Sequence, residues 1–273
     1  MGLAFFEEPT TRHLDGHDVE WFTPTDHCRG PWDAGACHAG PPTGLLVRAM
    51  QRAVPDVRLA RITVELQRPI PMAGFRIDGA VTRAGRTVAG TSATIVDGDG
   101  AVRATATGLH VREQRSLPFA TTLDNSGIAT PRLDDSEPGP FPIDASQHHG
   151  LEGFSGDAVR MRYPPGETRR PGATTSWMNT APLLPSETPS PFQAICPLAD
   201  CGNAFGRHAE PWEVAFVNAD LTIALHRDPV GDWFGSRAVS WWQPDGVGLA
   251  EALLFDDVGS VGRALQTMVL RPV

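Results

Sequence analysis

The feature that most constrains the fold is a repeat, in which two parts of the chain match at a constant separation of 159 positions. Residues 62–81 (ITVELQRPIPMAGFRIDGAV) align with residues 221–240 (LTIALHRDPVGDWFGSRAVS). Residues 93–112 (ATIVDGDGAVRATATGLHVR) align in the same way with residues 252–271 (ALLFDDVGSVGRALQTMVLR). The identical pairs include Thr63/Thr222, Leu66/Leu225, Arg68/Arg227, Phe75/Phe234, Val88/Val247, Ala93/Ala252, Asp97/Asp256, Gly100/Gly259, Val102/Val261 and Arg112/Arg271.

This match indicates a duplication rather than two sheets that look alike. Alternating polar and apolar residues could align by chance, but they would not hold one offset through a turn (DGDGAV against DVGSVG). We therefore expect an N-terminal unit at residues 1–115 and a C-terminal unit at residues 151–273 that pack together. Residues 116–150 are rich in Pro, Ser, Thr, Asp and Gly with little periodicity, which predicts a linker.

Within each unit the pattern predicts one helix and a series of long strands. Residues 40–54 (GPPTGLLVRAMQRAV) carry prolines suited to a first helical turn and apolar residues at helical spacing. Four strands joined by Asp- and Gly-rich turns follow, up to Arg112. In the second unit we expect the central helix within residues 191–206 (PFQAICPLADCGNAFG). One helix against a long antiparallel sheet, present twice, is an α+β arrangement.

The same segments resemble a known family, the TesB-like (type II) acyl-CoA thioesterases. Residues 38–71 (HAGPPTGLLVRAMQRAVPDVRLARITVELQRPIP) are similar to its first half, where a Gly-rich helix start precedes a strand ending in Arg-Pro. ADCGN (199–203) resembles the family's aspartate-bearing helix start, and NADLTIALHR (218–227) its strand before a His-Arg pair. GRALQTMVLR (262–271) resembles its last strand, which carries a glutamine. The resemblance implies a double hotdog fold, with two tandem units that each wrap a long antiparallel sheet around a central helix.

The resemblance also implies an activity and its residues. In that family an aspartate, a Thr or Ser hydroxyl and a glutamine of the second half hold and activate the water that hydrolyses the thioester. The aspartate corresponds to Asp200 and the glutamine to Gln266, whereas the hydroxyl position falls on Asn218. An amide can position a water but differs from a hydroxyl as donor and acceptor. We therefore expect hydrolysis of acyl-CoA by direct attack of an Asp-activated water, with no cofactor and no metal.

The chemistry of a thioester fits these residue types. Its thiol is a good leaving group, so hydrolysis needs a positioned water, a base and a donor for the developing oxyanion, without a covalent nucleophile. Asp200 could act as the base while Asn218 and Gln266 orient the water. Backbone N–H groups at a helix start suit the carbonyl oxygen, and the candidates are Ala39 and Gly40. Pro41 and Pro42 remove the next two amides, which limits the donors there.

The repeat makes this assignment asymmetric. At the offset of 159 positions, Asp200 falls on Pro41, Asn218 on Leu59 and Gln266 on Thr107. Only the second unit carries all three polar groups, so we expect one site where the duplication could have made two.

Other interpretations of the stretch CPLADCGN (196–203) have less support. Cys196 and Cys201 are separated by four residues without any CxxC pair, so a zinc site is not expected. A cysteine nucleophile would need a base, and His208 is the one nearby in sequence. Two functional alternatives stay open. A hotdog-fold enoyl-CoA hydratase or dehydratase would pair the aspartate with a histidine, and a non-catalytic acyl-thioester binding protein would need no base.

Charge and hydropathy restrict the partners. A net charge of −9 argues against nucleic acid or an anionic membrane surface as the main partner. No segment approaches the length of a membrane span, and the N-terminus does not read as a secretory signal, so we expect a cytoplasmic protein. The expected partner is a small-molecule acyl-CoA. Exposed sheet edges could also support a homo-oligomer, such as a dimer of double hotdogs.

Overall fold

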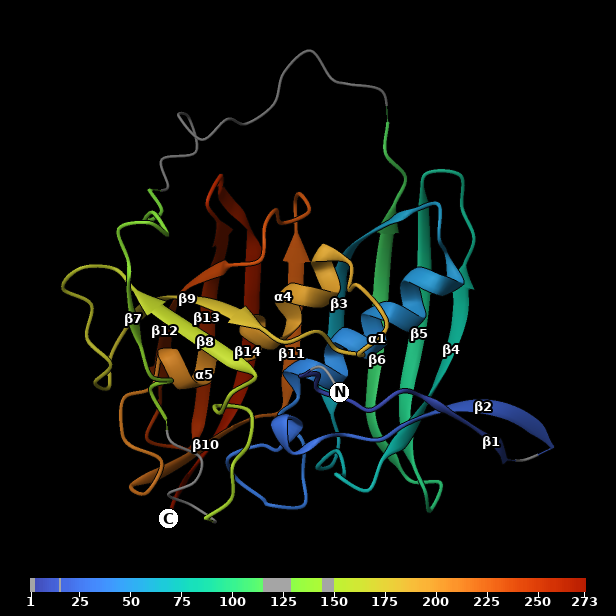
Figure 1. The fold of residues 1–273 in the computed structure, drawn as a ribbon, viewed down its shortest axis with the longest axis horizontal. Coiled ribbons are helices and arrows are strands. Elements are labelled where there is room, and N and C mark those ends of the chain that lie inside the picture. Colours follow the sequence, from blue (N-terminus) through green and yellow to red (C-terminus); the bar gives the residue numbers. More distant parts are fainter. Residues whose placement is uncertain (1–2, 15, 115–128, 144–149) are drawn as a thin grey trace.

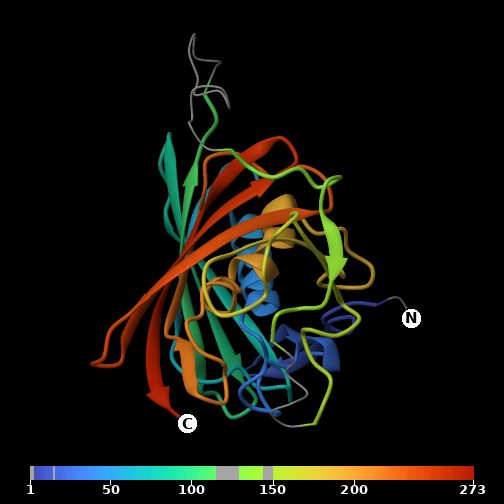
Figure 2. The ribbon, with the colours of Figure 1, turned by 90° about the vertical axis from the view of Figure 1, so that its left-hand side faces the viewer.

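A computed structural model describes residues 3–14, 16–114, 129–143 and 150–273. The described strands form one long, curved antiparallel sheet, and the helices lie against its inner face (Figures 1 and 2). Each half of the sheet packs on helices of its own half of the chain. The expected α+β class and double hotdog arrangement are therefore confirmed.

The N-terminal half contains the expected helix and the four strands that follow it. Its elements are β1 (Thr10–Leu14), β2 (His17–Phe22), a 3-10 turn (Asp26–Cys28), α1 (Gly40–Ala53), β3 (Arg58–Leu66), β4 (Phe75–Arg83), β5 (Val88–Asp97) and β6 (Val102–Val111). Pro41 and Pro42 occupy the first turn of α1, where their missing N–H groups leave no helical hydrogen bond unmade.

The C-terminal half has the corresponding strands but a divided helix. Its elements are β7 (Glu137–Gly139), β8 (Val159–Tyr163), β9 (Thr174–Thr180), α4 (Pro191–Ala199), α5 (Gly202–Phe205), β10 (Val214–Asn218), β11 (Asp220–Leu225), β12 (Phe234–Trp242), β13 (Val247–Asp256) and β14 (Gly259–Pro272). Residues 116–128 and 144–149 of the expected linker lie outside the described residues. Its described part contributes β7, which pairs with β8 at the edge of the sheet.

The two halves meet at the antiparallel pair of β3 and β11, in the middle of the sheet (Figure 1). Thr63 pairs with Thr222, its own counterpart in the repeat, and their hydroxyl oxygens are 3.1 Å apart. A residue that faces its own equivalent lies on a two-fold axis, here the axis that relates the two halves. The pairing within each half is also repeated: Gly79 pairs with Ala93 in the N-terminal half, and their counterparts Ala238 and Ala252 pair in the C-terminal half.

The last strand corrects the ungapped alignment. Thr63 pairs with Thr107 in β6, whereas its counterpart Thr222 pairs with Leu265 in β14, so these two strands match at an offset of 158 positions. The cause is the turn before the strand: Val96 pairs with Val102, while Phe255 pairs with Ser260 one residue sooner. The counterpart of Gln266 is therefore Gly108 and not Thr107.

The helices place Asp200 differently from the sequence prediction. Ser190 caps α4 by accepting a hydrogen bond from the Gln193 amide, and α4 ends at Ala199. Asp200 is the C-terminal cap of α4, so the expected position at a helix start is wrong, and Asp200 is not the structural equivalent of Pro41. A Cβ at Gly40 would lie 2.7 Å from the Cα of Pro197. Glycine therefore lets the start of α1 approach the end of α4 closely enough to meet Asp200.

A large hydrophobic core runs through both halves and includes residues of α1, α4, α5 and the inner face of the sheet. Within the described ranges, no helix is long and apolar enough to cross a membrane.

Candidate functional site

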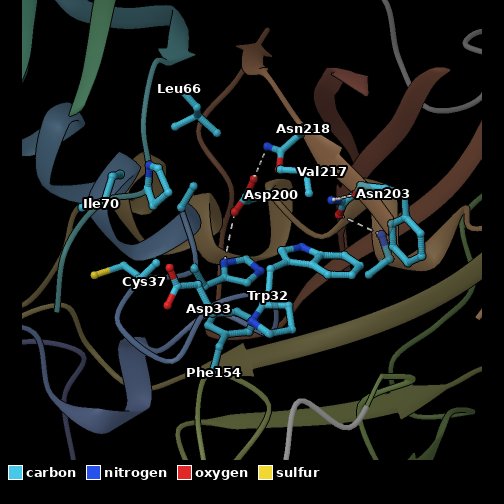
Figure 3. Close-up of a pocket in the computed structure, with 18 of the residues that line it drawn as sticks. Trp32, Asp33, Cys37, Leu66, Ile70, Phe154, Asp200, Asn203, Val217 and Asn218 are labelled. Carbon is cyan, nitrogen blue, oxygen red and sulfur yellow. Dashed lines mark hydrogen bonds and ion pairs between the residues drawn. The ribbon is translucent and has the colours of Figure 1, made fainter. Parts of the chain in front are cut away.

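Asp200 lines a cavity of about 500 Å³ whose walls come from both halves. The carboxyl group is almost fully buried, with 3% of the side chain exposed. Figure 3 shows it among side chains from both halves, with Asn218 on one side and Trp32, Cys37 and Phe154 on the other. A lone buried carboxylate is costly unless hydrogen-bond donors surround it, so its partners define the site.

Two amide side chains of the sheet converge on one oxygen of this carboxyl group. Asn218, at the end of β10, donates from Nδ2 to Oδ1 of Asp200 at 2.9 Å (Figure 3). Gln266, in β14, donates from Nε2 to the same Oδ1 at 3.1 Å and to the Asp200 carbonyl oxygen at 3.0 Å. The structure thus brings together the three residues that the sequence singled out.

Gln266 and Asn218 differ in their access to the cavity. Gln266 is 1% exposed, and its Oε1 accepts a hydrogen bond from the Asn203 amide at 2.8 Å, at the start of α5. It therefore holds Asp200 from behind, whereas the sequence analysis expected it to orient a water. Asn218 lines the cavity together with Asp200.

His38 is a site residue that the sequence analysis missed. It lies just before α1, and its Nδ1 is 3.1 Å from Oδ2 of Asp200. Its ring stacks on Phe154 with the ring centroids 3.8 Å apart. The histidine expected for a hydratase was sought near Asp200 in sequence, and His208 instead bonds the Ser240 carbonyl oxygen. The signal that could have found His38 is its place directly before the Ala39–Gly40 helix start.

Burial controls the charges of this pair. Desolvation raises the pKa of Asp200 to about 7, against the smaller lowering effects of hydrogen bonds from Asn218, the Gly40 amide, Gln266 and the Ala39 amide. Desolvation also lowers the pKa of His38 to about 3. Near neutral pH the imidazole is therefore uncharged, and the carboxyl group is poised between its two forms, as a general base requires.

Ala39 and Gly40 lie where the first turn of α1 faces Asp200. Their amides contribute hydrogen bonds that favour the carboxylate, and Ala39 lines the cavity. The positive end of the helix dipole adds to this effect. Both expected binding residues are thus part of the site, but their amides favour the Asp200 carboxylate, and the Gly40 amide also donates a hydrogen bond to Nδ1 of His38 at 3.2 Å.

The cysteines near the site are neutral thiols and do not provide a thiolate nucleophile. Cys201 is fully buried, its Sγ is 4.0 Å from Nε2 of His38, and burial raises the pKa of its thiol. Burial likewise raises the pKa of Cys196, and none of the four cysteines forms a disulfide. Over the described ranges, no group of three or more His, Cys, Asp or Glu side chains could hold a metal ion.

The cavity walls are mainly apolar and come from both halves. Trp32 packs edge-on against Phe216, and Phe141 packs edge-on against Phe154. Phe141 and Ile143 belong to the segment expected to be a linker, and both line the cavity. Three arginines also line it, namely Arg29, Arg68 and Arg271. An apolar cavity with a few polar groups at one end is the usual form of a small-molecule site.

Comparisons with known proteins agree with this architecture. Residues 28–110 match the model of the acyl-CoA thioesterase N-terminal domain, and residues 133–270 match that of the acyl-CoA thioesterase C-terminal domain. No curated protein sequence matches the chain at the significance required.

Solved structures show the same fold at low sequence identity. A hot dog fold protein of unknown function from Alicyclobacillus acidocaldarius is 16% identical with a TM-score of 0.72, covering 97% of each chain. A putative thioesterase II from Thermobifida fusca is 16% identical with a TM-score of 0.69, covering 94% of each chain. The acyl-CoA thioesterase II TesB2 from Mycobacterium marinum is 15% identical with a TM-score of 0.65, covering 97% of this chain and 96% of that one. The two family models lie in the order and at the places of the two hotdog units, and the chain therefore belongs to the acyl-CoA thioesterase family, as a thioester hydrolase.

Proposed function

We propose that this protein hydrolyses acyl-CoA thioesters by direct attack of a water molecule that Asp200 activates. The observation that carries the proposal is the buried Asp200 carboxyl group in the wall of a mainly apolar cavity, held by Asn218 and Gln266, with its pKa raised to about 7. Such a group is a stronger base than an exposed aspartate and is still ionised in a large fraction of molecules near neutral pH.

The reaction needs only this carboxylate and a water. Asp200 takes a proton from the water while the water oxygen forms a bond to the thioester carbon. This gives a tetrahedral oxyanion. The C–S bond then breaks, and the protonated Asp200 returns its proton to the departing sulfur. The products are a carboxylic acid and the free thiol of coenzyme A, and Asp200 is ionised again.

Asn218 can replace a hydroxyl in this scheme. Its Nδ2 donates hydrogen bonds to Oδ1 of Asp200 at 2.9 Å and to the Asp220 carbonyl oxygen at 3.3 Å. Its own Oδ1 then serves as the acceptor for a water in the cavity, which Asn218 lines. The amide thus orients the carboxylate with its nitrogen and the water with its oxygen.

The start of α1 supplies the donors for the oxyanion. Pro41 and Pro42 carry no N–H, and the Thr43 amide bonds the Ala39 carbonyl oxygen, so the Ala39 and Gly40 amides are the donors at this end. In the free enzyme they favour the Asp200 carboxylate. With substrate bound, they turn to the oxyanion as the proton moves onto Asp200 and removes its charge.

Thiol release from a panel of acyl-CoA substrates tests the proposal. We expect wild-type turnover with an acid limb near pH 7, and a fall in kcat of at least about 100-fold in Asp200→Asn, which keeps the shape of the side chain but cannot act as a base. Trp241→Ala, at a half-exposed site on β12, is the control. Retention of near wild-type kcat in folded Asp200→Asn would exclude the mechanism. Wild-type binding of acyl-CoA without thiol release would instead identify a binding protein.

The contact between His38 and Asp200 keeps a second function in view, the hydration of enoyl-CoA or its reverse. A histidine and an aspartate 3.1 Å apart provide an acid and a base for proton transfers at neighbouring carbons. In this structure, however, Nδ1 faces Asp200 and Nε2 faces Cys201, so neither ring nitrogen is directed at the cavity. Loss of the enoyl absorbance of crotonyl-CoA without thiol release would favour this function over hydrolysis.

A further inference from the structure

The contacts of the His38 ring show which of its two nitrogens can carry the proton. Nδ1 lies 3.1 Å from Oδ2 of Asp200 and accepts a hydrogen bond from the Gly40 amide at 3.2 Å. Nε2 lies 4.0 Å from Sγ of Cys201. One face of the ring is covered by Phe154, and 12% of the side chain is exposed. Each ring nitrogen therefore has an assigned neighbour, and water has little access.

The ionisation of Asp200 decides which nitrogen carries the proton. When Asp200 is ionised, a bare lone pair on Nδ1 would repel Oδ2, so Nδ1 must carry the proton and donate it, and the Gly40 amide then donates to the Asp200 carboxylate instead of to Nδ1. Nε2 is then unprotonated and faces Sγ of Cys201, whose thiol donates to the Pro197 carbonyl oxygen at 3.2 Å. When Asp200 is protonated, its O–H can donate to Nδ1, as the Gly40 amide does, and the proton of the imidazole moves to Nε2. The two tautomers thus match the two states of the carboxyl group.

We propose that His38 is the positioning residue of Asp200: protonated on Nδ1, it donates a hydrogen bond to Oδ2 that holds the carboxylate ionised and turned toward the water. The inference rests on the proposed hydrolysis, in which Asp200 is the base. Oδ1 is held by the two amides of the C-terminal half, and Oδ2 is held by the imidazole of the N-terminal half. Both units of the duplication are then needed for one working base.

The other titratable groups nearby do not replace this donor. Cys196 and Cys201 lie four residues before Asp200 and directly after it, and burial raises the pKa of both thiols, so they stay neutral. The charged groups that face the cavity from the loop before His38 and from the ends of β3 and β14 are Arg29, Asp33, Arg68 and Arg271. None of them forms an ion pair with Asp200, whose charged form is favoured only by hydrogen bonds.

Two substitutions of His38 separate the hydrogen bond that it donates from the packing of its ring. His38→Asn keeps an N–H donor near the place of Nδ1 but loses the stacked ring, whereas His38→Phe keeps a ring against Phe154 but cannot donate. We expect the acid limb of kcat/KM to move up by about one pH unit in His38→Phe and to stay near the wild-type value in His38→Asn, because one hydrogen bond to a charged group is worth roughly one pKa unit. For His38→Phe this is a loss of about tenfold at pH 6 and little loss at pH 9. His38→Leu serves as the non-donor if His38→Phe does not fold.

A second measurement does not depend on turnover. In each His38 background, the free energy of unfolding is compared across pH between the protein with Asp200 intact and the same protein carrying Asp200→Asn. The difference between the two gives the titration of Asp200 in the folded state. An upward shift in His38→Phe but not in His38→Asn supports the proposal. A wild-type midpoint in His38→Phe, or equal shifts in both variants, overturns it.

The same measurement keeps the two proposals apart. If wild-type protein releases no thiol from acyl-CoA, the proposed function fails, while the titration of Asp200 still decides the role of His38.

Discussion

The two halves share one fold but fill the same place in it with opposite chemistry. In the C-terminal half, Asn218 and Gln266 point from the sheet toward Asp200. Their structural counterparts in the N-terminal half are Leu59 and Gly108, both buried. Met50 of α1 fills the space above them, since a Cβ on Gly108 would lie 2.7 Å from its Sδ and 3.1 Å from Leu59 Cδ1.

This difference shows how a duplicated fold can carry a single site. In the N-terminal half, apolar side chains fill this place by packing against one another and need no partner from the other half. The polar version is stable only because donors from two strands and from the opposite half satisfy one buried carboxyl group. The helices also differ between the halves. In the N-terminal half α1 is continuous past Gly108, whereas in the C-terminal half α4 ends before its cap Asp200 and α5 begins at Gly202.

Removal of Gln266 should have the largest effect. Gln266→Ala takes away two hydrogen bonds to Asp200 and leaves the Asn203 amide without its acceptor. We expect kcat to fall by at least about 100-fold and the free energy of unfolding to fall by about 2 kcal/mol or more. Steady-state kinetics and urea unfolding measure the two effects.

The N-terminal half provides the matched control for that loss. Thr91→Val removes a buried hydrogen bond between Thr91 and His110, 2.9 Å long, from the equivalent part of the N-terminal half of the sheet. It should cost about 1 kcal/mol of stability and leave kcat unchanged. Equal losses of activity in both variants would mean that Gln266 acts through general stability alone.

An exchange across the duplication should have the next largest effect. Asn218→Leu gives the C-terminal half the residue of the other half and removes a donor to the Asp200 carboxylate. We expect kcat/KM at pH 7 to fall by about 10- to 100-fold, with the acid limb moved to higher pH. The reverse change, Leu59→Asn, buries an amide among apolar side chains and should cost about 2–3 kcal/mol with no change in kcat. Activity that survives Asn218→Leu would remove Asn218 from the site.

Much of this comparison could be predicted from the sequence, and the rest depends on contacts that a sequence does not encode locally. The duplication, the strands and the set of Asp200, Asn218 and Gln266 followed from periodicity and family motifs. The one-residue deletion in the β13–β14 turn stayed hidden, because the ungapped alignment still matched Val102 with Val261 and Arg112 with Arg271. His38 stayed hidden because its partner lies in the opposite half, far away in sequence.

The pH dependence of stability should show a smaller effect of the buried charge. Because the pKa of Asp200 is raised in the folded state to about 7, its contribution is most favourable below the unfolded value near 4 and is lost as pH rises through 7. Ionisation then costs at most about 4 kcal/mol at pH 8. Asp200→Asn should therefore be more stable than wild type by about 1–2 kcal/mol at pH 8, since the new amide forfeits the bonds from Ala39 and Gly40. Near pH 4, where Asp200 is neutral in the folded wild type, the gain should turn into a loss of about 2–3 kcal/mol in thermal unfolding, and a gain independent of pH would contradict the raised pKa.

The smallest effect tests the symmetry itself. Thr63 and Thr222 share one hydrogen bond across the two-fold axis, so Thr63→Val and Thr222→Val each remove the same interaction from equivalent surroundings. We expect each to lower the free energy of unfolding by about 0.5–1 kcal/mol, with the two values equal within about 0.3 kcal/mol. The double variant should lose little more than either single one, because the bond can be lost only once. Unequal single losses would show that the polar site of the C-terminal half distorts the sheet as far as the axis, whereas equal losses would confine the asymmetry to the interior around Asp200.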